Sequence, residues 1–190
     1  MPNEKRHPDY ARVRRQDRAV QDEAWIREFL HRAPYGVVAT AEGSQPFLNA
    51  NTFVYDEGAH AIYIHTAREG RTPANIEANP RVCFMVSEMG RLLPAQKAME
   101  FSCEYAGVVV FGRAELVQDE EEARRAMEML LSKYFPHLRP GNHYHAVSKD
   151  ELDVTAVFRI RIEQWSGKEK REAASFPGAF LYGESPESGT

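Results

Sequence analysis

The sequence contains little that suits secretion or membrane insertion. Only two of its 190 residues are cysteines, Cys83 and Cys103, and both lie in apolar runs typical of strands. We therefore expect buried free thiols and a reducing cytoplasmic location rather than a disulfide. No segment approaches the ~18 uncharged apolar residues of a transmembrane helix, so we expect no membrane partner. The first twenty residues are charged throughout and lack the apolar core of a secretory signal.

The charge balance and the motifs exclude two further classes. The chain has 24 basic and 28 acidic residues, for a formal net charge of −4, so it lacks the basic surface expected for a nucleic-acid partner. It also lacks the strand, glycine-rich loop and helix of the common nucleotide-binding folds. Its loop histidines, His137, His143 and His145, have no carboxylate or thiolate at helical spacing, and we expect no metal site.

The hydrophobic pattern indicates a mainly β chain. Apolar and polar residues alternate, or β-branched and aromatic residues run together, in six segments: residues 35–40, 47–55, 61–66, 81–87, 101–116 and 155–165. Such regular spacing with few helices predicts a closed or half-closed antiparallel β-barrel in a single domain. Segments 88–98 and 136–150 are expected to be loops.

Helices are expected at the margins of the barrel. Asp22 caps the first, and Pro34 ends it. Thr72 as the cap and Pro73 in the first helical position begin a short second helix. A third covers residues 119–134 and opens with four acidic residues, which favour the positive end of the helix dipole. The expected organisation is an arm (residues 1–20), a domain (21–168) and a C-terminal tail (169–190).

The segment HTAREGRTP, residues 65–73, is the candidate binding site. It places an imidazole at a strand end, then a glycine and an arginine directly before a helix. Helix N-terminal amides and a guanidinium both supply oriented donors and positive potential, so the pattern favours a phosphate or another anion. Arg68 or Arg71 alone would be an ordinary solvated charge. His65 alternates with Ile64 and should face away from the core.

Several motifs in order resemble one family. HTAREGR, NPRVCF, EYAGVVVFGRAELV and RIEQWSGKE are similar to the pyridoxamine 5'-phosphate oxidase-like split barrels that bind FMN. The branch they resemble most is that of the nitroimidazole-resistance (Nim) flavoproteins. The RRQDR run of the arm also resembles the start of that branch. The resemblance covers about residues 14 to 170. It implies an antiparallel split β-barrel and a homodimer with two FMN sites at the subunit interface.

The resemblance also implies which residues hold the flavin. The ribityl chain and phosphate would be surrounded by His65, Thr66, Ala67, Gly70, Arg71 and Thr72. The isoalloxazine edge would lie along Asn49, Ala50, Asn51 and Thr52, and the partner subunit would supply Trp165 and Lys168. The residues alone leave simpler alternatives open: Trp165 as a core or rim aromatic, and Asn49 and Asn51 as the solvent face of a strand.

The implied activity is that of an FMN-dependent oxidoreductase. Electrons from NAD(P)H would reduce the flavin, which would reduce a small aromatic, nitroimidazole-like acceptor. His65 is the candidate catalytic residue, as a proton donor or as a group that orients an anion. The run WSGKEKR replaces the Arg-Leu-x-Pro type end of pyridoxamine phosphate oxidases, which argues against vitamin B6 oxidation. The alternative is a non-catalytic flavin- or haem-binding protein, a carrier or sensor. The sequence does not identify the electron donor or the substrate.

Overall fold

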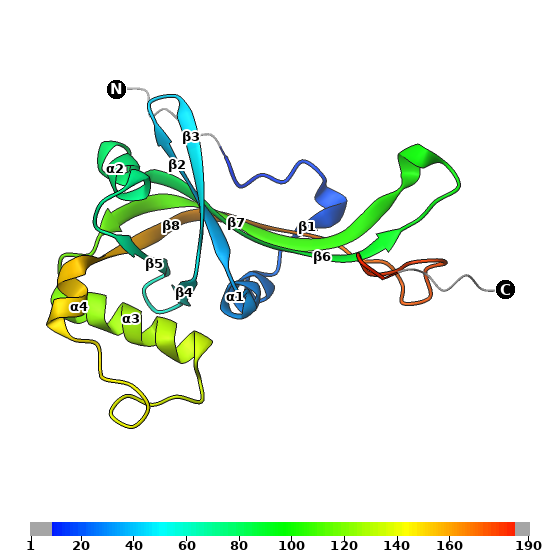
Figure 1. The fold of residues 1–190 in the computed structure, drawn as a ribbon. Helices are drawn as coiled ribbons and strands as arrows, with labels where there is room; N and C mark the ends of the chain where they lie inside the picture. Colours follow the sequence, from blue (N-terminus) through cyan, green and yellow to red (C-terminus); the bar gives the residue numbers. More distant parts are fainter. Residues whose placement is uncertain (1–8, 185–190) are drawn as a thin grey trace.

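The fold is one curled antiparallel sheet with helices around it. The computed structural model describes residues 9–184. Its eight-stranded sheet has the order β3-β2-β6-β7-β8-β5-β4, and the short β1 pairs with β8 (Figure 1). The prediction of a mainly β, antiparallel, single-domain fold is confirmed.

The elements follow the expected order, with longer strands than the sequence suggested. The strands are β1 Ala19–Val20, β2 Gly36–Glu42, β3 Gln45–Asn51, β4 Phe53–Asp56, β5 Ala61–Ala67, β6 Arg81–Leu93, β7 Ser102–Leu116 and β8 Thr155–Lys170. The helices are α1 Glu23–Arg32, α2 Arg71–Ala78, α3 Glu120–Tyr134 and α4 Lys149–Val154, with 3-10 turns η1 Gln16–Arg18 and η2 Ala98–Glu100. None of the helices within residues 9–184 is long and apolar enough to cross a membrane.

The barrel closes through a single residue. The two edges of the sheet are β3 and β4, and only Thr52 separates the end of β3 from the start of β4. The covalent chain therefore joins the two edges without a hydrogen-bonded ladder between them, so the barrel is half-closed. The prediction of one uninterrupted strand over residues 47–55 is wrong at Thr52, because the chain there leaves one edge of the sheet and enters the other.

Two hydrophobic clusters lie on opposite faces of β5. Ile62 and Ile64 belong to the main core inside the barrel, together with residues of β2, β4, β6, β7, β8, α1 and α2. Ala61 and Tyr63 belong to a second cluster, which packs the outside of the sheet against α3 and α4. Strand alternation therefore gives each face of β5 its own surroundings.

The predicted cap of α1 and the predicted α3 are confirmed, Asp119 acts as a cap that was not predicted, and the short helix α4 was missed. Asp22 accepts a hydrogen bond from the N–H of Ala24, and Asp119 accepts one from the N–H of Glu122. The prediction that residues 136–150 are all loop is wrong at its end, because α4 begins at Lys149. Ser148 and the residue three positions on, Glu151, form a capping box that satisfies the first amides of this helix.

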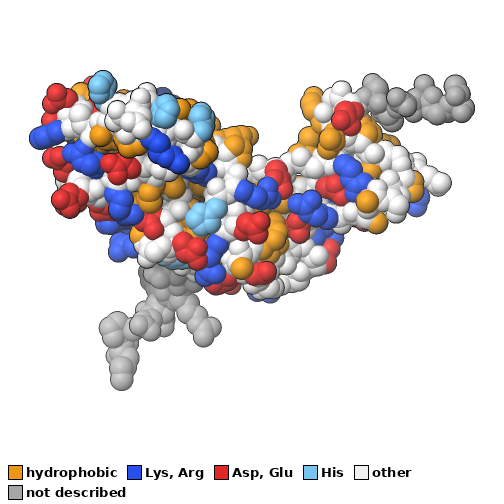
Figure 2. Space-filling view, turned by 90° about the horizontal axis from the view of Figure 1, so that it is seen from below, with side chains coloured by type: hydrophobic (Ala, Val, Ile, Leu, Met, Phe, Trp, Pro, Cys, Tyr) orange, Lys and Arg blue, Asp and Glu red, His pale blue; other side chains and the backbone are white. Residues whose placement is uncertain are grey.

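A long β6–β7 hairpin projects from the barrel (Figure 1). The prediction of a loop over residues 88–98 is wrong for residues 88–93, since β6 continues to Leu93, opposite Ser102. A register shift between Met89 and Leu92 interrupts the regular alternation there. In the space-filling view the hairpin forms a separate lobe, and acidic and basic side chains are mixed over the visible face (Figure 2).

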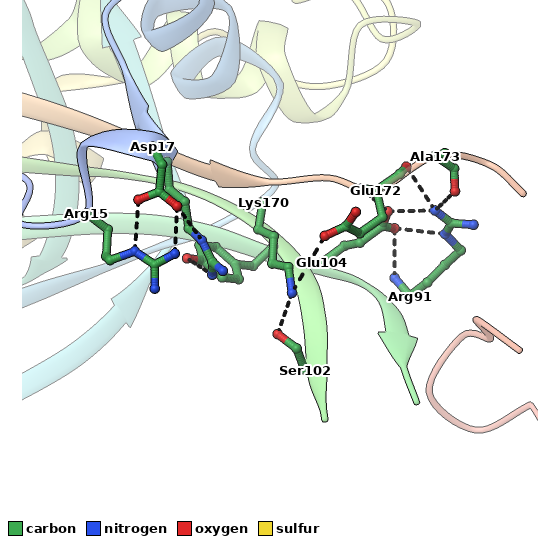
Figure 3. A network of polar contacts seen from close by, with 10 residues as sticks. Arg15, Asp17, Arg91, Ser102, Glu104, Lys170, Glu172 and Ala173 are labelled. Atoms are coloured by element: carbon green, nitrogen blue, oxygen red, sulfur yellow. Dashed lines mark hydrogen bonds and ion pairs between the residues drawn. The ribbon is translucent and has the colours of Figure 1, made fainter. Parts of the chain in front are cut away.

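A buried carboxylate holds the C-terminal tail on this hairpin. Glu104 accepts bonds of 2.9 and 2.7 Å from the Arg91 side chain and one of 2.9 Å from the N–H of Glu172 (Figure 3). These donors, the Arg91 guanidinium first, lower the pKa of Glu104 to about 2. Arg91 also donates to the carbonyls of residues 172–174. The segment after β8 is therefore attached to the fold along the hairpin.

The N-terminal arm is attached as well, in the part that the structure describes. Ala19 of β1 pairs with Lys168 of β8, and the ring of Tyr10 stacks on Phe111 at 5.7 Å between centroids. Arg18 donates to the Tyr105 hydroxyl at 3.1 Å. Residues 1–8 of the arm and 185–190 of the tail lie outside the described residues.

Candidate functional site

The features of the predicted anion site meet at the start of α2. The helix begins at Arg71, and its N-cap is Gly70, whose φ is 132°. The prediction that Thr72 caps the helix and Pro73 takes its first position is wrong, because both residues lie two positions deeper. Gly70 adopts a backbone conformation that residues with a side chain rarely adopt, and this turns the chain into the helix earlier.

Two backbone donors are open at this helix end. Pro73 has no N–H, and the N–H of Ala74 already donates to the Gly70 carbonyl at 3.2 Å. No side chain caps the helix. The amides of Arg71 and Thr72 therefore have no acceptor within the helix. A side chain at Gly70 would meet no atom within 4 Å, so the space beside the turn is open.

Side chains of β3 converge on the same point. Asn49 donates to the Thr72 hydroxyl at 3.4 Å and to the Asn51 side chain at 3.5 Å. Asn49 lies opposite Val38, a core residue, in the β2–β3 ladder, so both point to the inner side of the sheet. The two asparagines are half-buried and do not form a solvent face. We call the site formed by Asn49, Asn51, Gly70, Arg71 and Thr72 the α2 crevice.

Arg71 supplies a positive charge to the α2 crevice. Its side chain is exposed, and its guanidinium carbon lies 5.1 Å from the centre of the Phe47 ring. Among residues 9–184, no carboxylate forms an ion pair with it. Beneath the crevice, buried Asn75 donates to the Thr40 hydroxyl at 2.9 Å and fixes α2 on β2. The crevice therefore combines a rigid base with a cation available to a ligand.

Four other residues predicted to contact the flavin lie outside the α2 crevice. Thr66 uses its hydroxyl to donate to the Ala67 carbonyl at 2.8 Å. Ala67, Ala50 and Thr52 are exposed. Ala50 lies opposite Val37 and points to the outer side of the sheet, away from its neighbours Asn49 and Asn51.

His65 is not part of the α2 crevice. As predicted, it faces away from the barrel core, on the same side of β5 as Tyr63. There it lines a cavity of about 590 Å³, whose other walls come from α3, α4 and the loop between them. Its Nδ1 atom is buried without a hydrogen-bond partner, and burial lowers the pKa of its imidazole. The structure thus separates His65 from Asn49, Arg71 and Thr72 by the thickness of β5.

Within one chain, Trp165 and Lys168 are remote from His65. His65 pairs with Val157 of β8. Trp165 is eight residues further along that strand (157 to 165), ~26 Å at ~3.3 Å per residue. Its ring lies 6.2 Å from that of Tyr55 and packs on the core of its own chain. Lys168 lies opposite Gly107, on the outer side of the sheet.

The outer side of the sheet is strongly apolar. Residues directly opposite in a ladder share a face, so Ala50, Val37, Met85 and Val109 form one row across β3, β2, β6 and β7. The next row consists of Leu48, Ala39, Cys83 and Phe111. Leu48 is 65% exposed and Met85 45%. We call these two rows the outer sheet face. In β7 only Val109 and Phe111 belong to this face, because Val108 and Val110 point into the core.

The two cysteines are free, as predicted, but they are half-buried rather than fully buried. Burial raises the pKa of the Cys83 thiol, so this cysteine is poorly suited to act as a nucleophile. Among residues 9–184, no three histidine, cysteine or acidic side chains are placed to hold a metal ion.

The comparisons with known proteins agree with this architecture. The family model described as Pyridoxamine 5'-phosphate oxidase matches residues 22–169. A structure assigned to 5-nitroimidazole antibiotic resistance, from Bacteroides thetaiotaomicron, has a TM-score of 0.67 at 19% identity and covers 80% of this chain and 86% of its own. No curated protein matches the chain.

Two further similar structures carry more than one cofactor by their descriptions. The flavocytochrome Anf3 from Azotobacter vinelandii has a TM-score of 0.76 at 24% identity, covering 96% of this chain and 89% of its own. The FAD and haem binding protein from Mycobacterium smegmatis has a TM-score of 0.73 at 17% identity, with coverages of 82% and 74%. At these identities the likeness shows a shared fold.

Proposed function

The chain belongs to the pyridoxamine 5'-phosphate oxidase family, and from this premise we propose that it is a flavin-dependent oxidoreductase that binds FMN in the α2 crevice. The observation that carries the proposal is the start of α2. Two amides without acceptors and the unpaired Arg71 guanidinium lie together beside open space. A phosphate monoester, with its negative charge and several acceptor oxygens, matches this set of donors.

The residues of the crevice have separable tasks. The amides of Arg71 and Thr72 and the Arg71 side chain would bind the phosphate, and the amide groups of Asn49 and Asn51 would orient the polar part of the flavin. The bound flavin supplies two-electron chemistry, taking electrons from NAD(P)H and passing them to an acceptor. We propose a small aromatic, nitroimidazole-like acceptor, in line with the resistance protein of similar fold.

We further propose that the functional unit is a homodimer. The outer sheet face exposes apolar side chains over several strands, and such a surface is typical of an interface between subunits. Ala50 of this face lies between Asn49 and Asn51 along β3, so a second copy on this face would pack on the other side of the strand that carries the two asparagines of the crevice. Lys168 is on the same side of the sheet and is exposed, with its ammonium group 5.3 Å from the centre of the Tyr105 ring, so it would have to leave this contact to reach the partner's site. Trp165 is packed in its own chain, which makes its predicted contact with the partner's flavin the weaker of the two.

The experiment uses the purified full chain. Heat release of the bound chromophore, followed by chromatography, should yield FMN. The flavin absorbance should bleach when NAD(P)H is added without oxygen and should return when a nitroaromatic compound is added. FAD as the released cofactor would contradict the FMN assignment. Bleaching without reoxidation by any nitroaromatic compound would contradict the proposed acceptor.

A second function, haem binding, is favoured by one observation. His65 has a depressed pKa and presents a neutral imidazole to a cavity separate from the α2 crevice. Two proteins of similar fold are described as a flavocytochrome and as a FAD and haem binding protein. A carrier or sensor would bind its cofactors without the reoxidation by nitroaromatic compounds described above. For both of these functions we propose that the protein is cytoplasmic, where Cys83 and Cys103 would remain reduced.

A further inference from the structure

We propose that the cavity beside His65 is a haem site in which the His65 imidazole is an axial ligand of the iron. This inference rests on the second function above and gives it a place in the fold. The site lies between the outer side of β5 and the helices α3 and α4. We call it the His65 cavity.

The size and the walls of the His65 cavity suit a flat apolar ligand. Its volume of about 590 Å³ lies within the ~300–1,000 Å³ usual for cofactor and small-molecule sites. Met127 and Leu131 of α3 and Phe135 and Val154 beyond it line the cavity. Phe135 is 48% exposed and Val154 72%, so apolar side chains at the opening have nothing over them. A porphyrin ring in the cavity would cover them.

His65 has the properties of a metal ligand. Burial disfavours its charged form, so the imidazole is neutral near pH 7 and keeps a lone pair for coordination. Nδ1 is buried without a partner, which leaves Nε2 for a ligand in the cavity. One nitrogen ligand on an apolar wall is the minimum that haem iron requires of a protein. His65 and the apolar wall around it therefore fit haem.

Two arginines are attached to residues that line the cavity. Arg68 donates to the Leu152 carbonyl at 2.8 Å, and Arg124 donates to the Val147 carbonyl. Leu152 and Val147 both line the cavity, whereas the two arginines do not. Arg124 also forms an ion pair with Glu120 at 2.7 Å, so Arg68 is the better candidate to bind a haem carboxylate. The Glu151 carboxylate also lines it, but Ser148 binds this group through its N–H and its hydroxyl.

The loop between α3 and α4 brings a second histidine to the cavity. His145 lines it together with Tyr144 and Leu138, whereas His137 and His143 are absent from its lining. A second imidazole on the iron would produce a low-spin spectrum, and its absence a high-spin one. Of the loop histidines, only His145 is therefore expected to contribute to haem binding.

The test is a titration of the full chain with hemin, followed by the Soret band and the spin state. The parent should bind one hemin per chain. His65→Ala should weaken binding by more than the ~10–100-fold that loss of an outer-shell partner costs a metal site. His65→Gly should lose the ligand field and regain it when free imidazole is added. His137→Ala, an exposed histidine of the neighbouring loop, is the matched control and should bind as the parent does.

Flavin binding is measured on the same samples, which separates this inference from the proposed flavin site. His65→Ala should retain flavin, and Arg71→Ala should retain hemin, because the two sites lie on opposite faces of β5. Unchanged hemin affinity and spectrum in His65→Ala would overturn the assignment. So would equal loss in His137→Ala, or a parent chain that binds a nitroaromatic compound in this cavity and no hemin.

Discussion

Removal of the Arg71 guanidinium should weaken FMN binding by a defined amount. A hydrogen bond to a charged group contributes ~1.5–3 kcal/mol. Without ligand the guanidinium lies over the Phe47 ring, 5.1 Å from its centre, a contact worth ~0.5–1 kcal/mol at an exposed site. Binding exchanges the second interaction for the first, so Arg71→Ala should lose ~1–2 kcal/mol. This corresponds to a ~5- to 30-fold increase in Kd.

Quenching of flavin fluorescence at two salt concentrations measures this effect. The parent should bind FMN more weakly at higher salt, because the phosphate contact is between exposed charges, and Arg71→Ala should be less sensitive. Arg71→Lys keeps the charge without the planar pair of donors and should lie between the two. Arg68→Ala is the control, since Arg68 is in the same loop but donates to the Leu152 carbonyl. An Arg71→Ala Kd within twofold of the parent, or equal loss in Arg68→Ala, would refute the phosphate assignment.

Three further predictions concern the tail, the second core and the dimer. Glu104→Gln should reduce the protection of the Glu172 amide from hydrogen exchange, measured against the intrinsic rate at the same pH. In the parent this protection should also fall as the pH drops from the ordinary glutamate range towards the pKa of about 2, because the depressed pKa means that ionisation stabilises the contact. Slow exchange in Glu104→Gln would refute this anchoring. Tyr63→Phe should lose ~1–2 kcal/mol of unfolding free energy in urea, because its hydroxyl donates to Glu122 at 2.6 Å. Burial, and then this hydrogen bond, raise the pKa of Tyr63 to about 12, so the stabilisation by the neutral hydroxyl should fade between about pH 10 and 12. An unchanged midpoint in Tyr63→Phe would contradict this prediction. Met85→Arg should convert the proposed dimer to monomers in sedimentation experiments, whereas a monomeric parent would refute the proposed interface.

Local capping signals could be read from the sequence where they depend on one side chain and its own helix. Asp22 caps α1 as predicted, and Asp119, predicted only as the first of four acidic residues at the start of α3, is the cap of that helix. The capping box at Ser148 and Glu151 was equally local and could have revealed α4. The start of α2 was misjudged because Thr72-Pro73 by itself is a good start for a helix. In the structure Gly70, two residues earlier, is the N-cap instead.

Features that depend on distant partners could not be read in this way. The extension of β6 is accompanied by the Arg91–Glu104 contact and by the tail, which lies far away in the sequence. Alternation predicted correctly that His65 faces away from the core, but not that α3 and α4 would enclose it in a cavity. The convergence of Asn49 with Thr72 likewise depends on how β3 and α2 pack, so only the family resemblance had joined them.

Thr52, the single residue between β3 and β4, links the strand that carries Asn49 and Asn51 to a firmly held part of the core. Immediately after Thr52, the N–H of Phe53 donates to the Tyr134 hydroxyl at 3.0 Å, and that hydroxyl donates to the Phe53 carbonyl at 3.2 Å. The ring of Phe53 is wholly enclosed and meets Phe84 edge-on. Immediately before Thr52, Asn51 belongs to β3, which pairs only with β2. The β3 strand is thus held along its whole length by β2 and, through Thr52, at its end by α3, so Asn49 and Asn51 have fixed positions in the crevice.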